Sequence, residues 1–289
     1  MLGLGKWMGE HPLRPAIAAM ALIAALGASA CVTGPPRADR DWYPYLARTA
    51  HLEFSEDRFA VAPVSDWSYA EAGLVTQADT DAAFDFDALR EVWFVLEPQP
   101  GSRLAAHTFL LFEFEGDRLL GLTIEARRET SEDYSAVRGI FNAFELSYVW
   151  ASARDLMTRR AVMLQHDVFM YPVAIDDAQK RGLLRALLAR TQELAQRPRY
   201  YNTLFSNCTN ELAKAAGFSW APAYILTGRS DEYLFRRGII PGDSFAEAHE
   251  RSDVTAFVQA LNDAPPGLFD ASLLAEARRR FGANVSPQP

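Results

Sequence analysis

The alternation of apolar and polar residues predicts β-strands over most of the first two thirds of the chain. Short, aromatic-rich runs bounded by turn residues are typical of strands. The clearest pair is joined by Glu115-Gly116-Asp117, because glycine beside acidic residues between two β-rich runs favours a tight hairpin. The predicted strands are 51–54, 59–64, 92–96, 106–114, 118–127, 147–151 and 168–175.

The spacing of leucines predicts a long helix after the last strand. Asp176 or Asp177 is a suitable cap for a helix that runs to about Gln196, and Pro198 stops it. The apolar face of this helix comprises Leu183, Leu184, Leu187, Leu188 and Leu194.

A second, short helix is expected from Cys208 to about Ala216. Ser206 or Asn207 is its cap, and Gly217 is its terminator. Short helices and loops follow in the tail. Together these elements predict an α+β fold: an antiparallel sheet with helices packed on one side.

The first thirty residues have the pattern of a secretory signal. Lys6 and Arg14 precede a charge-free apolar run, 15–30, which is somewhat shorter than the roughly 20 residues of a membrane-spanning helix. The run ends in Ala28-Ser29-Ala30-Cys31. This pattern predicts that the body of the protein lies outside the cytoplasm.

Three fates of this segment stay open. Ala-x-Ala is typical of a signal-peptidase site and of a soluble periplasmic product. Small residues directly before a cysteine resemble a bacterial lipobox, although Ala28 stands where leucine is preferred. We favour lipidation of Cys31, because cysteine is scarce in this chain, with the protein anchored to a membrane and facing the periplasm. An uncleaved anchor is the third alternative.

The composition shift after the signal divides the chain into four predicted parts. These are a signal peptide (1–30), a polar tether (31–41), a periplasmic catalytic domain (42–220) and a helical C-terminal extension (221–289) that packs on the domain and has a disordered end.

Charge and histidine spacing exclude two classes of function. The 289 residues carry a formal net charge of -8, whereas a nucleic-acid binder needs a basic surface. No two of the five histidines have the spacing of metal ligands on a helix, so a metal site is not expected.

Cys208 is the strongest candidate for chemistry. If Cys31 is lipidated or removed, Cys208 has no disulfide partner in an oxidising compartment. Its predicted place in the first turn of a helix lowers the pKa of a thiol, and the backbone N–H groups there can stabilise an oxyanion. The alternative is a buried, inert cysteine.

His107 and Glu125 are the candidate base and orienting group. With the hairpin turn centred on Gly116, the two residues face each other across adjacent strands, about 5 Å apart, close enough for a carboxylate to orient an imidazole. The alternatives are a core histidine and a surface ion pair of Glu125 with a neighbouring arginine.

A series of short motifs runs from about Trp42 to Gly217. They are Ala106-His-Thr-Phe-Leu, Glu125-Ala-Arg-Arg-Glu129, Tyr148, Asp155-Leu, Tyr171-Pro and Tyr201-Asn-Thr-Leu-Phe-Ser-Asn-Cys208-Thr. In these stretches the sequence resembles the Lnb N-terminal periplasmic domain family. Members resemble circularly permuted papain-like enzymes of the NlpC type, in which the histidine strand comes first and the cysteine helix last.

The resemblance implies acyl transfer through a cysteine thioester, and this chemistry implies no cofactor. Cys208 is then the nucleophile, His107 the general base and acid, and Glu125 the orienting group, with a membrane lipid or a lipoprotein as acyl donor. Lnb itself is an integral membrane enzyme that moves an acyl chain to a lipoprotein's N-terminal amine. Its multi-span region is not seen in this sequence, so we do not transfer the substrate. A lipidated Cys31 would hold the domain at a membrane surface.

Several polar residues near the expected site are candidates for substrate binding. Arg127 and Arg128 suit a lipid phosphate, but neighbours on a strand point opposite ways, so at most one should face the site. His166, beside Asp167, is a rival base that nothing pairs with Cys208. The complete set of binding candidates is Arg127, Arg128, Tyr201, Asn202 and Asn207.

Two other functions stay open. One is a cysteine peptidase or amidase that acts on cell-wall peptide, for which an open polar cleft beside Cys208 is expected; a deep apolar groove favours acyl chains. The other is a non-catalytic envelope lipoprotein that binds a lipid or a partner, in which Cys208 is unreactive and buried.

Overall fold

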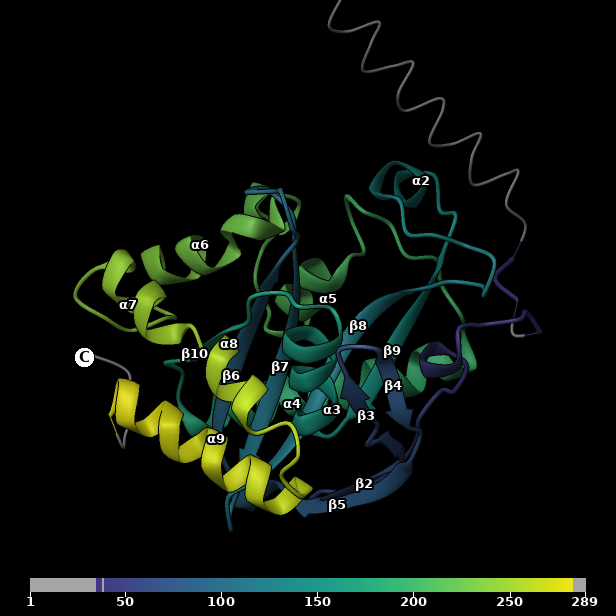
Figure 1. The fold of residues 1–289 in the computed structure, drawn as a ribbon. Coiled ribbons are helices and arrows are strands. Elements are labelled where there is room, and N and C mark those ends of the chain that lie inside the picture. The colour runs from purple at the N-terminus through teal and green to yellow at the C-terminus, as the bar shows by residue number, and fades with distance from the viewer. Residues whose placement is uncertain (1–34, 38, 283–289) are drawn as a thin grey trace, which may run out of the picture.

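The structure is a computed structural model that describes residues 35–37 and 39–282. Its centre is a sheet of eight strands, antiparallel except for a single parallel pairing of Ser65 with Ala151 (Figure 1). The path across it is β1 (His51–Phe54), β2 (Arg58–Ser65), β9 (Glu145–Ala151), β8 (Arg118–Arg127), β7 (Ala106–Phe114), β6 (Leu89–Pro98) and β10 (Phe169–Pro172); β5 (Asp79–Asp85) also pairs with β2, and β3 (Ser68–Ala70) with β4 (Gly73–Thr76) forms a separate hairpin.

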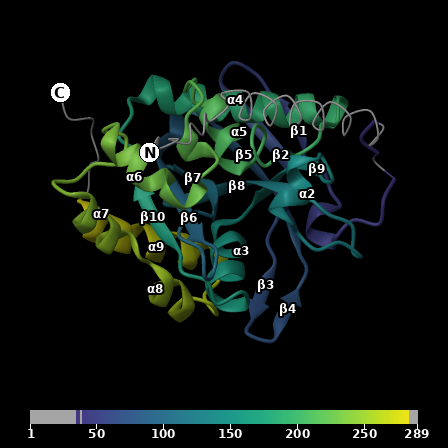
Figure 2. The same cartoon turned by 90° about the horizontal axis from the view of Figure 1, so that it is seen from above.

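Helices cover both faces of this sheet, so the expectation of helices on one side is wrong (Figure 2). One face carries α4 (Asp177–Gln196) and α5 (Cys208–Ala215); the other carries α3 (Ala153–Thr158), α8 (Thr255–Ala260) and α9 (Pro266–Phe281). The remaining helices are α2 (Ala136–Ile140), α6 (Ser230–Arg236) and α7 (Phe245–Ser252).

The central strands explain why both faces need cover. Along β7, Leu110 packs toward α4 and α5, whereas Phe109 and Leu111 pack into the cluster formed with α3 and α9. An uninterrupted apolar run is typical of a strand buried on both faces. The segment from Phe109 to Phe112 is such a run. Its pattern therefore indicates a second layer of helices on the other face of the sheet.

Most predicted elements are present with small changes of boundary. The strands 51–54, 106–114 and 118–127 have the expected bounds, and the last strand is shorter, ending at Pro172. Asp176 caps α4 in a reciprocal capping box with Gln179, and Asn207 caps α5. The signal, Cys31 and the last seven residues lie outside the described residues.

The strands β7 and β8 separate toward the end that carries the candidate residues. Their ladder stops at the pair Phe109–Thr123. Beyond it, His107 keeps its partner on β6 and Glu125 keeps its partner on β9, but the two do not pair with each other. Helix α5 packs against both strands. Thr209 in its first turn meets Thr108 of β7 at 2.9 Å, so that Cys208 lies at this end of the sheet.

Candidate active site

Cys208 is the first residue of α5, where local sequence fixes the helix start. The side chain of Asn207 accepts a hydrogen bond from the Asn210 N–H at 2.8 Å, which satisfies one of the helix's unpaired donors. The Asn207 amide also donates to two carbonyl oxygens, those of Thr203 and Tyr224. This holds the first turn rigidly, and with it the thiol of Cys208.

His107 and Glu125 approach each other where their strands have parted. His107 Nε2 lies 3.3 Å from Glu125 Oε1 and 2.6 Å from Thr123 Oγ1, and the Thr123 hydroxyl donates to the same carboxylate oxygen at 2.9 Å. Nε2 is therefore the nitrogen that faces the carboxylate, and Nδ1 remains for the thiol. Thr123 thus bridges the imidazole and the carboxylate.

The charges of this group support a thiolate–imidazolium pair. Burial alone would lower the pKa of His107, but Glu125 and Cys208 outweigh it and raise that pKa to about 10. Burial alone would raise the pKa of Cys208, but His107 and hydrogen bonds from Thr108 outweigh it and lower that pKa. The pKa of Glu125 is also lowered, because His107 and Arg160 overcome the effect of burial.

A buried ion network extends behind Glu125. Arg160 lies at ion-pair distance from two carboxylates, 3.2 Å from Glu125 Oε1 and 2.8 Å from Glu97 Oε2. Glu97 in turn approaches His166 Nδ1 at 2.6 Å. His166 therefore has Glu97 as a carboxylate partner, and it lies in the same cleft as Cys208.

These residues line a cleft of about 330 Å³ that is part polar and part apolar. Of the residues predicted to bind substrate, Arg128, Tyr201 and Asn207 line it. Tyr201 is buried, and its hydroxyl meets that of Tyr134 at 3.2 Å. Asn207 is engaged in holding the helix start, so its amide is not free for a ligand.

Arg127 and Asn202 point elsewhere. Arg127 donates to the carbonyl oxygens of Leu46 and Ala47 and stacks on Trp42. The Asn202 carbonyl accepts from the backbone of the loop that precedes α5, and its amide donates to Ile140 and Asn142. Both side chains hold loops in place outside the cleft lining.

Sequence reasoning missed Thr123, Arg159, Arg160 and Glu97. Thr123 was within reach of the argument, because it stands two residues before Glu125 on one strand and so shares its face. Arg159 and Arg160 belong to a π-helical turn (Arg159–Met163) after α3, and nothing in the local pattern indicates that this turn meets the cleft.

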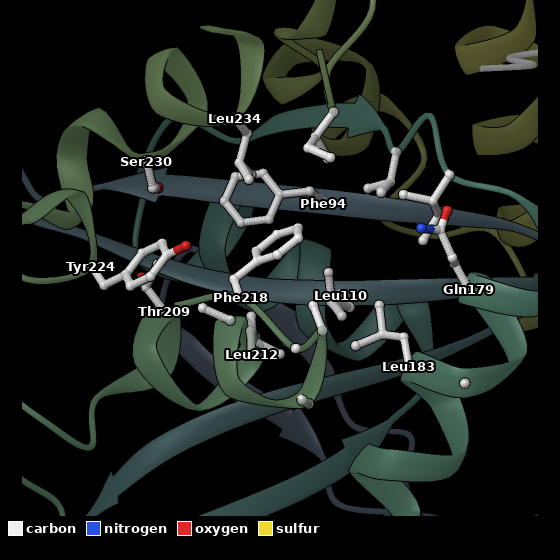
Figure 3. Close-up of a pocket in the computed structure, with 18 residues that line it drawn as sticks. Phe94, Leu110, Gln179, Leu183, Thr209, Leu212, Phe218, Tyr224, Ser230 and Leu234 are labelled. Atoms are coloured by element: carbon white, nitrogen blue, oxygen red, sulfur yellow. The ribbon is translucent and has the colours of Figure 1, made fainter. Parts of the chain in front are cut away.

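A second, apolar cavity of about 360 Å³ lies beside α5 (Figure 3). Its walls come from β6 and β7, α4, α5 and α6, and no charged side chain lines it. Thr209, directly after Cys208, lines this cavity and meets Thr108 at 2.9 Å. One turn of helix therefore borders both spaces. The labelled lining residues are Phe94, Leu110, Gln179, Leu183, Thr209, Leu212, Phe218, Tyr224, Ser230 and Leu234.

Fold and site together define a class: an α+β protein with a largely antiparallel sheet, at whose end a cysteine, a histidine and a carboxylate converge. The chain belongs to the Lnb N-terminal periplasmic domain family, which it matches over residues 76–230. It is therefore an exported envelope protein of that family. No curated protein and no solved structure matches the chain significantly.

Membrane and metal sites are not found in the part of the chain that the structure describes. No helix between residues 39 and 282 is both long and apolar enough to cross a bilayer. Nor does any group of three histidine, cysteine or acidic side chains in that range have the geometry to hold a metal ion.

Proposed function

We propose that this protein is an envelope cysteine acyltransferase that moves a fatty acyl chain through a thioester on Cys208. The observation that carries the proposal is that Cys208, the first residue of α5, lines one cleft with His107 and Glu125, whose Nε2 and Oε1 atoms lie 3.3 Å apart. Covalent acyl transfer requires a nucleophile, a base that activates it and a third group that orients the base. Circularly permuted papain-like topology stays a prediction, supported by a histidine strand that precedes the cysteine helix.

The proposed reaction has two halves. The Cys208 thiolate attacks the carbonyl carbon of an acyl ester, and N–H groups of the first turn of α5 stabilise the oxyanion. The ester C–O bond then breaks, and the His107 imidazolium gives its proton to the leaving alcohol. An amine acceptor attacks the thioester, His107 takes the amine's proton, and the C–S bond breaks to restore the thiolate.

The apolar cavity beside α5 favours an acyl chain over a cell-wall peptide. It is lined by Leu212 and other apolar side chains without a charge, and Thr209, the residue that follows Cys208, is part of its lining. Burying each methylene group of a chain there contributes about 0.8 kcal/mol. A peptide backbone would lose its hydrogen bonds with water in such a space. Lipidation of Cys31, outside the described residues, would keep the domain near such substrates.

Transfer assays with defined substrates test this proposal. Purified protein is incubated with a fluorescent-acyl phospholipid or a diacylated lipopeptide as donor, and with a lipopeptide bearing a free N-terminal amine as acceptor. We expect Cys208-dependent transfer to the amine, abolished by Cys208→Ser and reduced at least about a hundredfold by His107→Ala. Release of free fatty acid alone would indicate a hydrolase. Cleavage of cell-wall peptide without acyl transfer would contradict the proposal.

A further inference from the structure

Arg128 and Arg159 line the Cys208 cleft. Among the described residues, no carboxylate lies within ion-pair distance of either guanidinium group. Arg128 Nη2 donates to the hydroxyl of Tyr45 at 2.8 Å. The guanidinium carbon of Arg159 lies 3.5 Å from the centroid of the same Tyr45 ring. All three side chains line the cleft. The two guanidinium groups therefore converge on one aromatic residue beside the candidate nucleophile.

Two neighbouring arginines, Arg160 and Arg127, have structural roles and serve as a comparison. Arg160 is buried between Glu97 and Glu125 and is neutralised by them. Arg127 lies outside the cleft lining and donates its hydrogen bonds to backbone carbonyl oxygens. Arg128 and Arg159 have neither arrangement. Arginines that line a cleft without a described carboxylate at ion-pair distance, in a chain of net charge -8, indicate an anionic ligand, because each guanidinium still has N–H donors that an anion can use.

We propose that Arg128 and Arg159, seated on Tyr45, bind the phosphate of a phospholipid acyl donor. This subsite rests on the proposed acyltransferase function and names its donor class. The planar forks of two guanidinium groups match the oxygens of a phosphate, and their contacts with Tyr45 hold them in place before the ligand arrives.

The position of the subsite fits the chemistry of such a donor. In a glycerophospholipid, the phosphate and the acyl esters are attached to one glycerol unit, so a bound phosphate holds the ester carbonyl a few bonds away. A single cleft of about 330 Å³ contains both Cys208 and the arginine pair. The diacylglyceryl group of a lipoprotein carries no phosphate, and the subsite therefore favours the phospholipid.

Binding to a protein that cannot turn over tests the subsite directly. In the Cys208→Ala background, calorimetry compares dihexanoylphosphatidylglycerol with dihexanoylglycerol, which has the same acyl chains and no phosphate. We expect the phosphate-bearing probe to bind at least about tenfold more tightly, and this ratio to fall several-fold in Arg159→Gln and in Arg128→Gln. Arg279→Gln, which removes an equal charge from the exposed end of α9, should leave the ratio unchanged.

Each outcome decides the matter. Equal affinity for the two probes, or a ratio unaffected by both arginine variants, overturns the subsite. Binding of inorganic phosphate that depends on Arg159, without preference for the phosphatidyl probe, assigns the site to free phosphate and also overturns the lipid donor. Arg128→Gln serves if Arg159→Gln fails to fold. If the ratio behaves as expected but wild-type protein never forms an acyl-cysteine, the subsite stands and the acyltransferase proposal fails.

Discussion

At the scale of single residues, the reactivity of Cys208 depends on the charge of His107. Iodoacetamide should label Cys208 well below the pH at which a free thiol of pKa about 8.5 reacts, because the pKa of this thiol is lowered by His107. In His107→Ala the burial remains and the positive charge is lost, so the pKa of Cys208 should rise. Labelling at pH 7 should then slow at least about tenfold. The measurement is the labelling rate from pH 5 to 9, and a wild-type midpoint near 8.5 contradicts the account.

Thr123 should matter through His107 rather than through substrate. Thr123→Val keeps the side chain's shape but removes the hydroxyl that bridges the imidazole and Glu125. A hydrogen bond contributes about 0.5–1.5 kcal/mol, so labelling of Cys208 should slow by roughly two- to tenfold. Thr80→Val, on the exposed strand β5, is the matched control and should change nothing. An unchanged rate in Thr123→Val removes Thr123 from the positioning of His107.

At the scale of elements, the cap at the start of α5 should affect both the stability of the fold and the reactivity of Cys208. Asn207→Ala removes the cap and leaves the Thr203 carbonyl without its Asn207 donor, whereas the Tyr224 carbonyl keeps the Asn210 amide. It should lower the free energy of unfolding by about 2 kcal/mol. It should also slow labelling of Cys208. Asp176→Ala removes the cap of α4 and should cost about 1 kcal/mol without affecting labelling. Denaturant unfolding and labelling rates check both variants, and an unaltered labelling rate in Asn207→Ala would show that the cap does not position Cys208.

Local patterns were sufficient for the elements that carry the site. The hairpin 106–127 and the helix at Cys208 follow from turn chemistry, alternation and capping residues, and these elements bring His107, Glu125 and Cys208 into one cleft. The separation of β7 from β8 beyond Phe109 was not predictable, because it depends on packing against α5. Arg160 was missed for the same reason, since its turn reaches Glu125 only through the tertiary fold.

At the scale of the whole molecule, the C-terminal helices close the second face of the sheet. Asp270 of α9 accepts a hydrogen bond from the Leu119 N–H on β8 at 2.9 Å, and burial raises the pKa of this carboxyl to about 7. Because the folded pKa lies above the unfolded value of about 3.9, the protein loses stability as pH rises between these values, and the loss is complete above about 7.

Asp270→Asn should therefore stabilise the protein in a pH-dependent way. The amide keeps an acceptor for Leu119 and never ionises. Its advantage over wild type in free energy of unfolding should be greater at pH 8 than at pH 5 by about 2 kcal/mol. Asp263→Asn, in the exposed loop before α9, is the control. Equal advantages at the two pH values would show that Asp270 does not titrate as described.

Export concerns the chain as a whole. The basic residues, apolar run and Ala-Ser-Ala-Cys31 of the first segment predict cleavage before Cys31 and lipidation of its thiol. Mass spectrometry of the mature N-terminus should find a diacylglyceryl-modified Cys31. An N-terminus that begins at Met1 contradicts export by this route, and an unmodified Cys31 indicates the soluble periplasmic form.

The central claim is that Cys208 carries an acyl group during turnover. Intact-mass analysis of protein purified from membranes tests it most directly, by comparing the mass before and after treatment with neutral hydroxylamine, which cleaves thioesters. The account predicts a fraction with an added fatty acyl mass on Cys208 that hydroxylamine removes and that Cys208→Ser lacks. Protein whose Cys208 is never acylated, even after incubation with donor lipid, and which resists alkylation until it is unfolded, would contradict the account.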